Sequence, residues 1–313
     1  MPIPDVSLAR LRAFLTVVDA GGFTAAAQRL HLTQQAVSAA VTRLEGDLGV
    51  RLLERTSRTQ RLTGAGAAFA DHAREIVEAW ERAVSETHQL DRADRRVLRV
   101  GAMAGAALEL TDPILEAFAA AEPGATVELE PHLYDDPSAG LLGGTADVAL
   151  LRPPLTLDGL VLTDLLVEPR IVLVAESHPL AGRGTVSLDQ LRPFAVARPA
   201  GPDDVWNAFW SADADPASSL PVTTLEEALE LVAAGRAWAL APIGWTRFYA
   251  RIGLDALLSD ELPPSVLALG RRRGERNPLV HRFIDVALRV AAQHPDAVPH
   301  AVPPTRATAA RPG

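Results

Sequence analysis

Apolar residues recur at helical spacing over the first 50 residues of the chain, in three short runs. The first run follows Ser7, a favourable N-cap, and stops at Gly21-Gly22; its apolar positions are Leu8, Leu11, Leu15 and Val18. A second, short helix is expected to follow Thr24, which would be its N-cap. A third begins after Thr33 and places on one face Val37, Val41, Leu44 and Leu48. Two helices joined by the tight turn His31-Leu32-Thr33 predict a helix-turn-helix.

Two short segments after the third predicted helix flank a polar turn. Residues 52–55 and 60–63 are expected to pair around Thr56-Ser57-Arg58-Thr59 as a small hairpin, or wing. Residues 1–65 are therefore predicted to form a winged helix-turn-helix that binds double-stranded DNA.

A single long helix is predicted next, as a linker over residues 66–90. Its apolar positions alternate between spacings of 4 and 3: Phe69, Ala73, Ile76, Trp80, Ala83, Thr87 and Leu90. A narrow apolar seam with charged flanks is typical of a coiled coil, so we expect a homodimer. The alternative is a helix that packs on its own domain.

Beyond residue 96, apolar runs of strand length alternate with helical segments. Strands are expected at 98–103, 126–132, 148–154, 170–176, 193–197, 221–225, 237–243 and 265–273. Helices are expected at 108–123, 141–149, 203–210, 225–235 and 278–293. This alternation predicts an α/β domain over 97–295 with largely parallel sheets.

The α/β domain is expected to have two lobes with a ligand cleft between them. The first lobe would comprise about 97–165 and 265–295, and the second about 166–264. The last segment, 296–313, is rich in proline and alanine and is predicted to be a disordered tail.

Charge separates the first 65 residues from the rest of the chain. The net charge is −9, and all 30 basic residues are arginine. Residues 1–65 hold eight arginines and five acids, a balance of +3, which leaves −12 for the remainder. A basic head on an acidic body favours DNA contact at that end. Without cysteine, an apolar run long enough to span a bilayer or a signal peptide, we expect a cytoplasmic protein that does not bind membranes.

The segment FTAAAQRLHLTQQAVSAAVTRLEGDLGVRLLERTSRTQRLTGAG (23–66) closely resembles the N-terminal signature of LysR-type transcriptional regulators. The resemblance continues through the linker and through the phrases at 177–191 and 223–242, and it covers residues 7–295. It implies a winged helix-turn-helix, a long dimerising linker helix and a two-lobed effector domain of the type II periplasmic-binding-protein fold. It also implies a homodimer or homotetramer regulated by a small-molecule effector.

In such a motif the second helix presents its N-terminal residues to base edges in the major groove. The residues expected there are Thr33, Gln34, Gln35, Ser38 and Thr42, followed by Arg43 at a phosphate or groove edge. We expect the wing to contact the DNA backbone or the adjacent minor groove through Arg55, Arg58 and Arg61. Arg10 is expected to contact a phosphate. The alternative is that Gln34, Gln35 and Ser38 form only a solvated face. Since Ala39 and Ala40 lack donors, much of the affinity should come from the wing.

The resemblance places the effector site between the lobes, where strand ends and helix N-termini converge. The candidates are Ala102, Met103, Ala104, Arg152, Pro153, Arg198, Thr223 and Thr224. Met103 stands where many relatives have serine or threonine. We therefore expect the arginines to supply positive charge and Trp206 or Trp245 an apolar wall, for a small organic acid.

Each of these assignments has a structural alternative. Thr224 would be only a helix N-cap, with Glu227 completing a capping box. The arginines would be solvated, and the tryptophans would belong to the core.

Other functions find less support in the residues. The eight histidines show no metal-ligand spacing, and no nucleophile elbow, phosphate-binding loop or dinucleotide fingerprint occurs, so we expect neither an enzyme nor a cofactor. An architectural or constitutive DNA-binding protein with a vestigial effector domain remains the alternative to a ligand-responsive regulator.

Overall fold

The computed structural model describes residues 5–55, 60–103, 107–156, 158–248, 253–298 and 300–302. The chain divides into two compact units, Met1–Glu86 and Thr87–Gly313. Within the described ranges, no helix is both long enough and apolar enough to cross a membrane.

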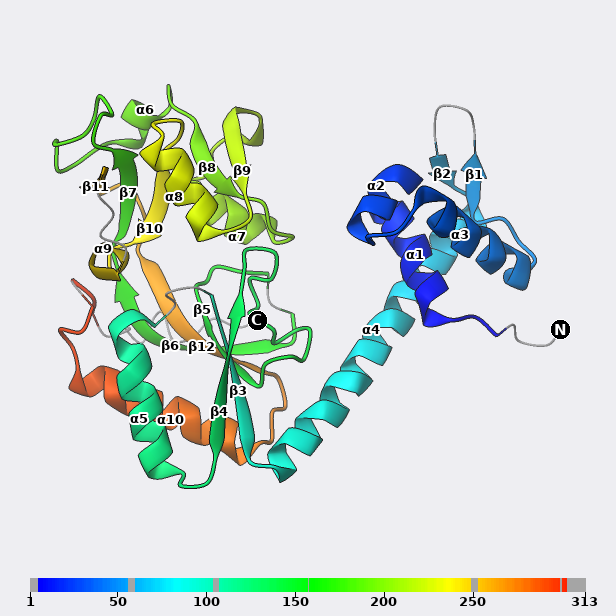
Figure 1. Ribbon diagram of the computed structural model, residues 1–313, viewed down its shortest axis with the longest axis horizontal. Coiled ribbons are helices and arrows are strands. Elements are labelled where there is room, and N and C mark those ends of the chain that lie inside the picture. Colours follow the sequence, from blue (N-terminus) through cyan, green and yellow to red (C-terminus); the bar gives the residue numbers. More distant parts are fainter. Residues whose placement is uncertain are drawn as a thin grey trace. The chain divides into compact units, whose positions relative to one another are not determined.

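The first unit is a three-helix head with a hairpin wing and the start of a long helix (Figure 1). Its elements are α1 (Leu8–Asp19), α2 (Phe23–Arg29), α3 (Gln34–Leu48), β1 (Leu53–Arg55), β2 (Gln60–Leu62) and α4 (Gly64–Asp94), which continues into the second unit. The core includes the predicted Val37, Val41 and Leu44 of α3, all fully buried. Gly49, with φ at 70°, ends α3 in the left-handed conformation that glycine adopts without strain. The predicted helix-turn-helix and wing are therefore confirmed.

One local prediction in the head was wrong, and two were confirmed only in part. Thr24 does not cap α2, because the helix already begins at Phe23, after Gly22. Ser7 occupies the N-cap position of α1, but its side chain makes no capping hydrogen bond. The buried face of α1 is broader than the predicted one: it adds Ala13, Phe14 and Val17 to the predicted positions, which all pack in the same core.

The first half of α4 has one covered face and one exposed apolar stripe. Ala70, Ala73 and Val77 are buried in the core of the head, and Phe69 packs against a phenylalanine of α1 at 5.8 Å between ring centroids. Farther along the helix, large apolar side chains are exposed: Ile76 at 49%, Trp80 at 55% and Val84 at 37%. The predicted seam therefore has two parts. Its first positions pack within the head, as the alternative predicted, whereas Ile76 and Trp80 are exposed.

In the second unit, the first lobe is built on a five-stranded sheet in the order β4-β3-β5-β12-β6. The strands are β3 (Val97–Met103), β4 (Thr126–His132), β5 (Val148–Leu151), β6 (Leu160–Glu168) and β12 (Ser265–Arg272). The short helix η1 (Leu108–Leu110) precedes α5 (Thr111–Ala121), which packs with α10 (Pro278–Gln293) on the sheet (Figure 1). Apolar residues of both helices and of the sheet form one continuous core.

The second lobe contains two smaller sheets. Antiparallel strands in the order β10-β7-β11 form one, and the parallel pair β8-β9 forms the other. The strands are β7 (Arg170–Ala175), β8 (Val196–Pro199), β9 (Ser219–Val222), β10 (Ala239–Pro242) and β11 (Leu254–Leu258). The helices are α6 (Leu188–Leu191), α7 (Asp204–Phe209), η2 (Pro216–Ser218), α8 (Leu225–Ala233) and α9 (Trp245–Phe248). The prediction of largely parallel sheets was therefore wrong for this lobe.

Several boundaries of the second unit differ from the predictions. The expected helix at 141–149 is a series of turns ending in β5; Gly144 within it and Gly140 just before it have positive φ. Strands β6 and β11 were not predicted. Since β6 stays in the first sheet to Glu168, the chain crosses between the lobes at Pro169, not at 166.

The segment predicted to be a disordered tail is partly ordered. Val298 is buried in the core of the first lobe, and Val302 pairs with Val167 of β6. The rest of the segment, 299 and 303–313, lies outside the described residues.

Candidate nucleic-acid interface and ligand cavity

The exposed side of α3 forms a shallow polar groove on the surface of the head. It is lined by Gln34, Gln35, Ser38, Ala39, Thr42 and Arg43. These positions repeat at helical spacing opposite the buried Val37 and Val41, so one helix both fills the core and presents the groove. None of the six is acidic. Such a face can donate to and accept from base edges without repelling phosphates.

Two side chains hold α3 and the wing in place. The Thr33 hydroxyl accepts from the backbone N–H of Ala36 at 3.2 Å, which confirms the predicted N-cap. Glu45 Oε1 accepts from the backbone N–H groups of Leu52 at 2.9 Å and Leu53 at 3.0 Å, and so ties the wing to α3. This tertiary role of Glu45 was missed, because nothing in its local spacing indicates it.

The predicted phosphate-binding arginines differ in what the structure shows of them. Arg61 is exposed on β2, opposite Glu54 in the hairpin register. Arg55 ends β1, and only its backbone is described. Arg58 lies outside the described residues. Arg10, which is predicted to contact a phosphate, forms an ion pair with Asp47 in the free head.

The second unit has a cavity between its two lobes, with about 790 Å³ of space including the part open to solvent. The first lobe contributes Met103, His132, Leu133, Tyr134 and Arg152. The second contributes mainly apolar and aromatic groups: Leu173, Ala197, Pro199, Trp206, Trp210, Val222, Thr224, Leu225, Glu226, Ala228, Leu229, Ala239, Leu240 and Trp245. Its apolar and aromatic walls are typical of a small-molecule site.

Only some of the predicted effector residues line this cavity. Met103, Arg152 and Thr224 do, together with both predicted tryptophans. The described residues that line the cavity do not include Ala102, Pro153, Arg198 or Thr223. Ala104 lies outside the described residues.

Alternation along the strands explains two of these absences. Ala102 precedes Met103 in β3 and packs against the helix-covered core of the first lobe. Arg198 lies in β8 between Ala197 and Pro199, which both face the cavity, so its side chain belongs to the opposite face.

Arg152 is the one arginine among the described residues that line the cavity, and it already forms an ion pair. Its Nη1 donates to Glu168 Oε1 at 2.8 Å and to Ser265 Oγ at 3.0 Å. Glu168 Oε2 accepts from the backbone N–H of Gly244 at 2.8 Å. Both charged side chains are buried, so the pair is shielded from solvent.

Carboxylates also accept from backbone N–H groups at the start of α7 and just before α8. The Thr224 hydroxyl accepts from Glu227 N–H at 3.1 Å, which confirms that Thr224 caps α8. Glu227 Oε2 accepts from the backbone N–H of Thr223 at 2.6 Å and from its hydroxyl at 2.9 Å, and these bonds lower the Glu227 pKa. At α7, Asp203 Oδ1 accepts from Trp206 N–H at 2.9 Å. Asp203 Oδ2 accepts from the backbone N–H of Thr156 at 2.6 Å.

A buried arginine that sequence reasoning missed lies at the crossing between the lobes. Arg170 Nε donates to the carbonyl oxygen of Pro263 at 2.7 Å, and Nη1 donates to that of Phe209. Its guanidinium also stacks 3.6 Å from the centroid of the Phe209 ring. Burial lowers the pKa of Arg170 to about 10, which still leaves it charged at neutral pH.

A winged helix-turn-helix with a polar recognition face, followed by a two-lobed domain with a ligand cavity, defines a ligand-binding DNA-binding regulator. Residues 8–67 match the model of the bacterial regulatory helix-turn-helix protein of the lysR family, and residues 91–292 match the LysR substrate binding domain. The chain belongs to the LysR family of transcriptional regulators. It is a DNA-binding transcriptional regulator with an effector-binding domain and not an enzyme.

Relatives along nearly the whole chain agree with this assignment. The HTH-type transcriptional regulator TcbR of Pseudomonas sp. (strain P51) is 32% identical over 90% of this chain and 98% of its own length. The HTH-type transcriptional regulator AlsR of Bacillus subtilis (strain 168) is 25% identical over 90% and 95%.

Solved structures support the fold. A full-length BenM variant matches with a TM-score of 0.54 at 24% identity, covering 96% of this chain and 100% of BenM. The oxidised form of Corynebacterium glutamicum OxyR matches with a TM-score of 0.51 at 24% identity, covering 92% of each chain.

Proposed function

We propose that this regulator acts in the cytoplasm and reads a specific operator through Gln34, Gln35, Ser38 and Thr42. Arg43 and the wing arginines Arg55, Arg58 and Arg61 would bind phosphates or the minor groove. The observation that carries the proposal is the acid-free polar groove on α3, which an N-cap and the Glu45 hydrogen bonds hold in place. Glutamine can pair with adenine through two hydrogen bonds in the major groove, which supplies sequence preference.

Gln34→Ala tests this assignment. It should weaken binding to the selected operator by about 1–3 kcal/mol and leave binding to random DNA nearly unchanged. Gln28→Ala is the matched control, since Gln28 is exposed on α2 and is not part of the groove. Arg43→Ala should weaken both kinds of complex and reduce the slope of affinity against salt by about 1.

The operator itself would come from selection of random DNA by the purified protein. Equal losses on operator and random DNA for Gln34→Ala would contradict the division of roles. A selection that yields no preferred sequence would instead favour the architectural alternative.

We also propose that two copies associate through the exposed stripe Ile76, Trp80 and Val84 of α4. Three large apolar side chains on one exposed helix face are a surface that a second helix can cover. A dimer would present two heads to two half-sites, which suits a head with a net charge of only +3. Assembly of dimers into a tetramer is compatible with this arrangement.

The effector site proposed for the second unit is the cavity between its lobes. A compound that binds there with different affinity for two arrangements of the lobes would shift their populations and so change operator binding. Titration of the protein–operator complex with candidate compounds measures this coupling.

A further inference from the structure

The walls of the cavity are rich in aromatic rings. Tyr134 and Trp206 are 5.1 Å apart between centroids in an edge-to-face arrangement, and Trp206 and Trp210 are 6.2 Å apart. Trp245 lines the same cavity from α9. Such rings bind flat apolar groups, and their faces also attract cations.

The positive groups at the cavity are already compensated by acids of the protein. Arg152 is bound to the buried Glu168. Asp203 caps α7 through the N–H of Trp206, and Glu227 accepts from the N–H of Thr223, just before α8. A carboxylate ligand would therefore have to compete with an acid that is already in place at each of these groups.

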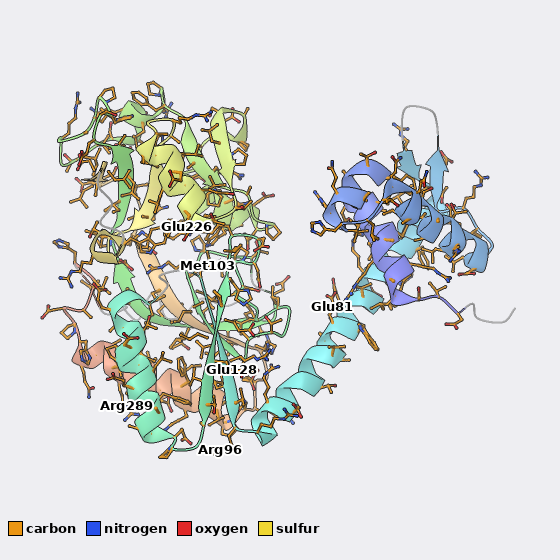
Figure 2. The ribbon with its side chains drawn as sticks, in the orientation of Figure 1. Glu81, Arg96, Met103, Glu128, Glu226 and Arg289 are labelled. Carbon is orange, nitrogen blue, oxygen red and sulfur yellow. The ribbon has the colours of Figure 1, made fainter. Side chains whose placement is uncertain are left out.

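A negative charge, by contrast, is available to a ligand. Glu226 is exposed in the first turn of α8 and lines the cavity, and in the described part of the chain no basic side chain forms an ion pair with it. Figure 2 shows Glu226 at the edge of the second lobe that faces Met103 of the first. Met103 places an apolar thioether where a hydroxyl would favour an anion.

Provided that this cavity is the effector site, as proposed above, we propose that its effector is an aromatic amine rather than an organic acid. The ring lies against Tyr134, Trp206 and Trp245, and the ammonium group lies beside Glu226. This assignment replaces the organic acid expected from the arginines in the sequence.

Three probes that each have one aromatic ring separate the contribution of ligand charge to the affinity from that of the ring: benzylamine, benzyl alcohol and benzoate. Isothermal titration of the full-length protein should give affinities in the order amine, alcohol, acid, with at least a tenfold difference between amine and acid. Glu226→Gln should weaken benzylamine by up to about fivefold, as expected for an exposed ion pair, and leave benzyl alcohol unchanged. Glu230→Gln is the matched control, because Glu230 lies on α8 but is not among the residues that line this cavity.

A second variant adds a positive charge at the cavity without changing a core residue. Leu133 lines the cavity and is half exposed, so Leu133→Arg should fold normally and shift the preference from benzylamine toward benzoate. Tighter binding of benzoate than of benzylamine by the unchanged protein, or equal affinities, would overturn the amine proposal.

The failure of the effector site itself has a different signature. If the probes bind but neither Glu226→Gln nor Leu133→Arg changes any affinity, the ligand lies outside this cavity. That result would overturn both the effector-site part of the proposed function and the amine proposal.

Discussion

The buried pair between Arg152 and Glu168 can be broken by one nearly isosteric change, Glu168→Gln. Glu168 is 1% exposed and accepts from Arg152 and from the backbone of Gly244, each at 2.8 Å. The amide removes the negative charge and turns an N–H donor toward one of these donors. The guanidinium of Arg152 then stays buried without its counter-ion.

The size of the effect follows from this geometry. Removing one partner of a buried ion pair costs about 3–5 kcal/mol, and Ser265 Oγ, which keeps one hydrogen bond to Arg152, favours the lower end. We therefore expect Glu168→Gln to lower the free energy of unfolding of the second unit by about 3 kcal/mol. For a domain of this size that corresponds to roughly 6–12 °C in Tm, and the unit remains folded at 25 °C.

Urea denaturation followed by tryptophan fluorescence measures this loss, because four of the five tryptophans (206, 210, 238 and 245) lie in the second unit. Glu176→Gln, at an exposed position after β7, should change the free energy by less than about 0.5 kcal/mol. Adding Arg152→Met to Glu168→Gln should recover part of the loss, because it removes the uncompensated charge. If Glu168→Gln matched the Glu176→Gln control in stability, the ion-pair reasoning would be refuted.

Three further changes test other parts of the molecule. Trp80→Asp should shift the sedimentation of the protein toward the monomer, because it puts a charge in the exposed stripe of α4; an unchanged oligomer would show that the stripe is not the interface. Gly66→Ala should lower the Tm of the head, since a Cβ there would clash with the backbone carbonyl of Leu52, whereas Gly64→Ala, with open space around it, should not. Hydrogen bonds lower the Glu227 pKa below its ordinary 4.5, so its contribution to stability is complete above pH 4.5 and is lost as the pH falls through the lowered value. Urea titrations at several pH values should accordingly show Glu227→Gln differing from the unchanged protein only above this range.

The head of the molecule could be predicted from the sequence because its information is local. The apolar spacing of Val37, Val41 and Leu44 fixes which side of α3 is buried, and therefore which side carries Gln34 and Gln35. The errors there, such as the cap assigned to Thr24, concern helix ends, where several polar residues compete for the same N–H groups.

The cavity could be predicted only in outline because its electrostatics depend on contacts between distant segments. Strand β6 was missed since Asp164 and Glu168 interrupt its apolar pattern, yet both are buried in the folded chain. Without that strand, the partner of Arg152 could not be identified, and an arginine that is bound to a glutamate was interpreted as a ligand for acids.

The same contacts determine the free-energy cost of binding an acidic ligand. Glu168 lies next to the crossing at Pro169 and is bonded to Arg152 in the first lobe and to Gly244 in the second. A carboxylate that drew Arg152 away would leave Glu168 buried without a counter-ion, at a cost of about 3–5 kcal/mol. Micromolar binding corresponds to only about 8 kcal/mol, so an acid would lose about half of its binding free energy to this rearrangement. An amine beside the exposed Glu226 breaks no such pair, and the cavity therefore discriminates between the two charges through its own buried carboxylate.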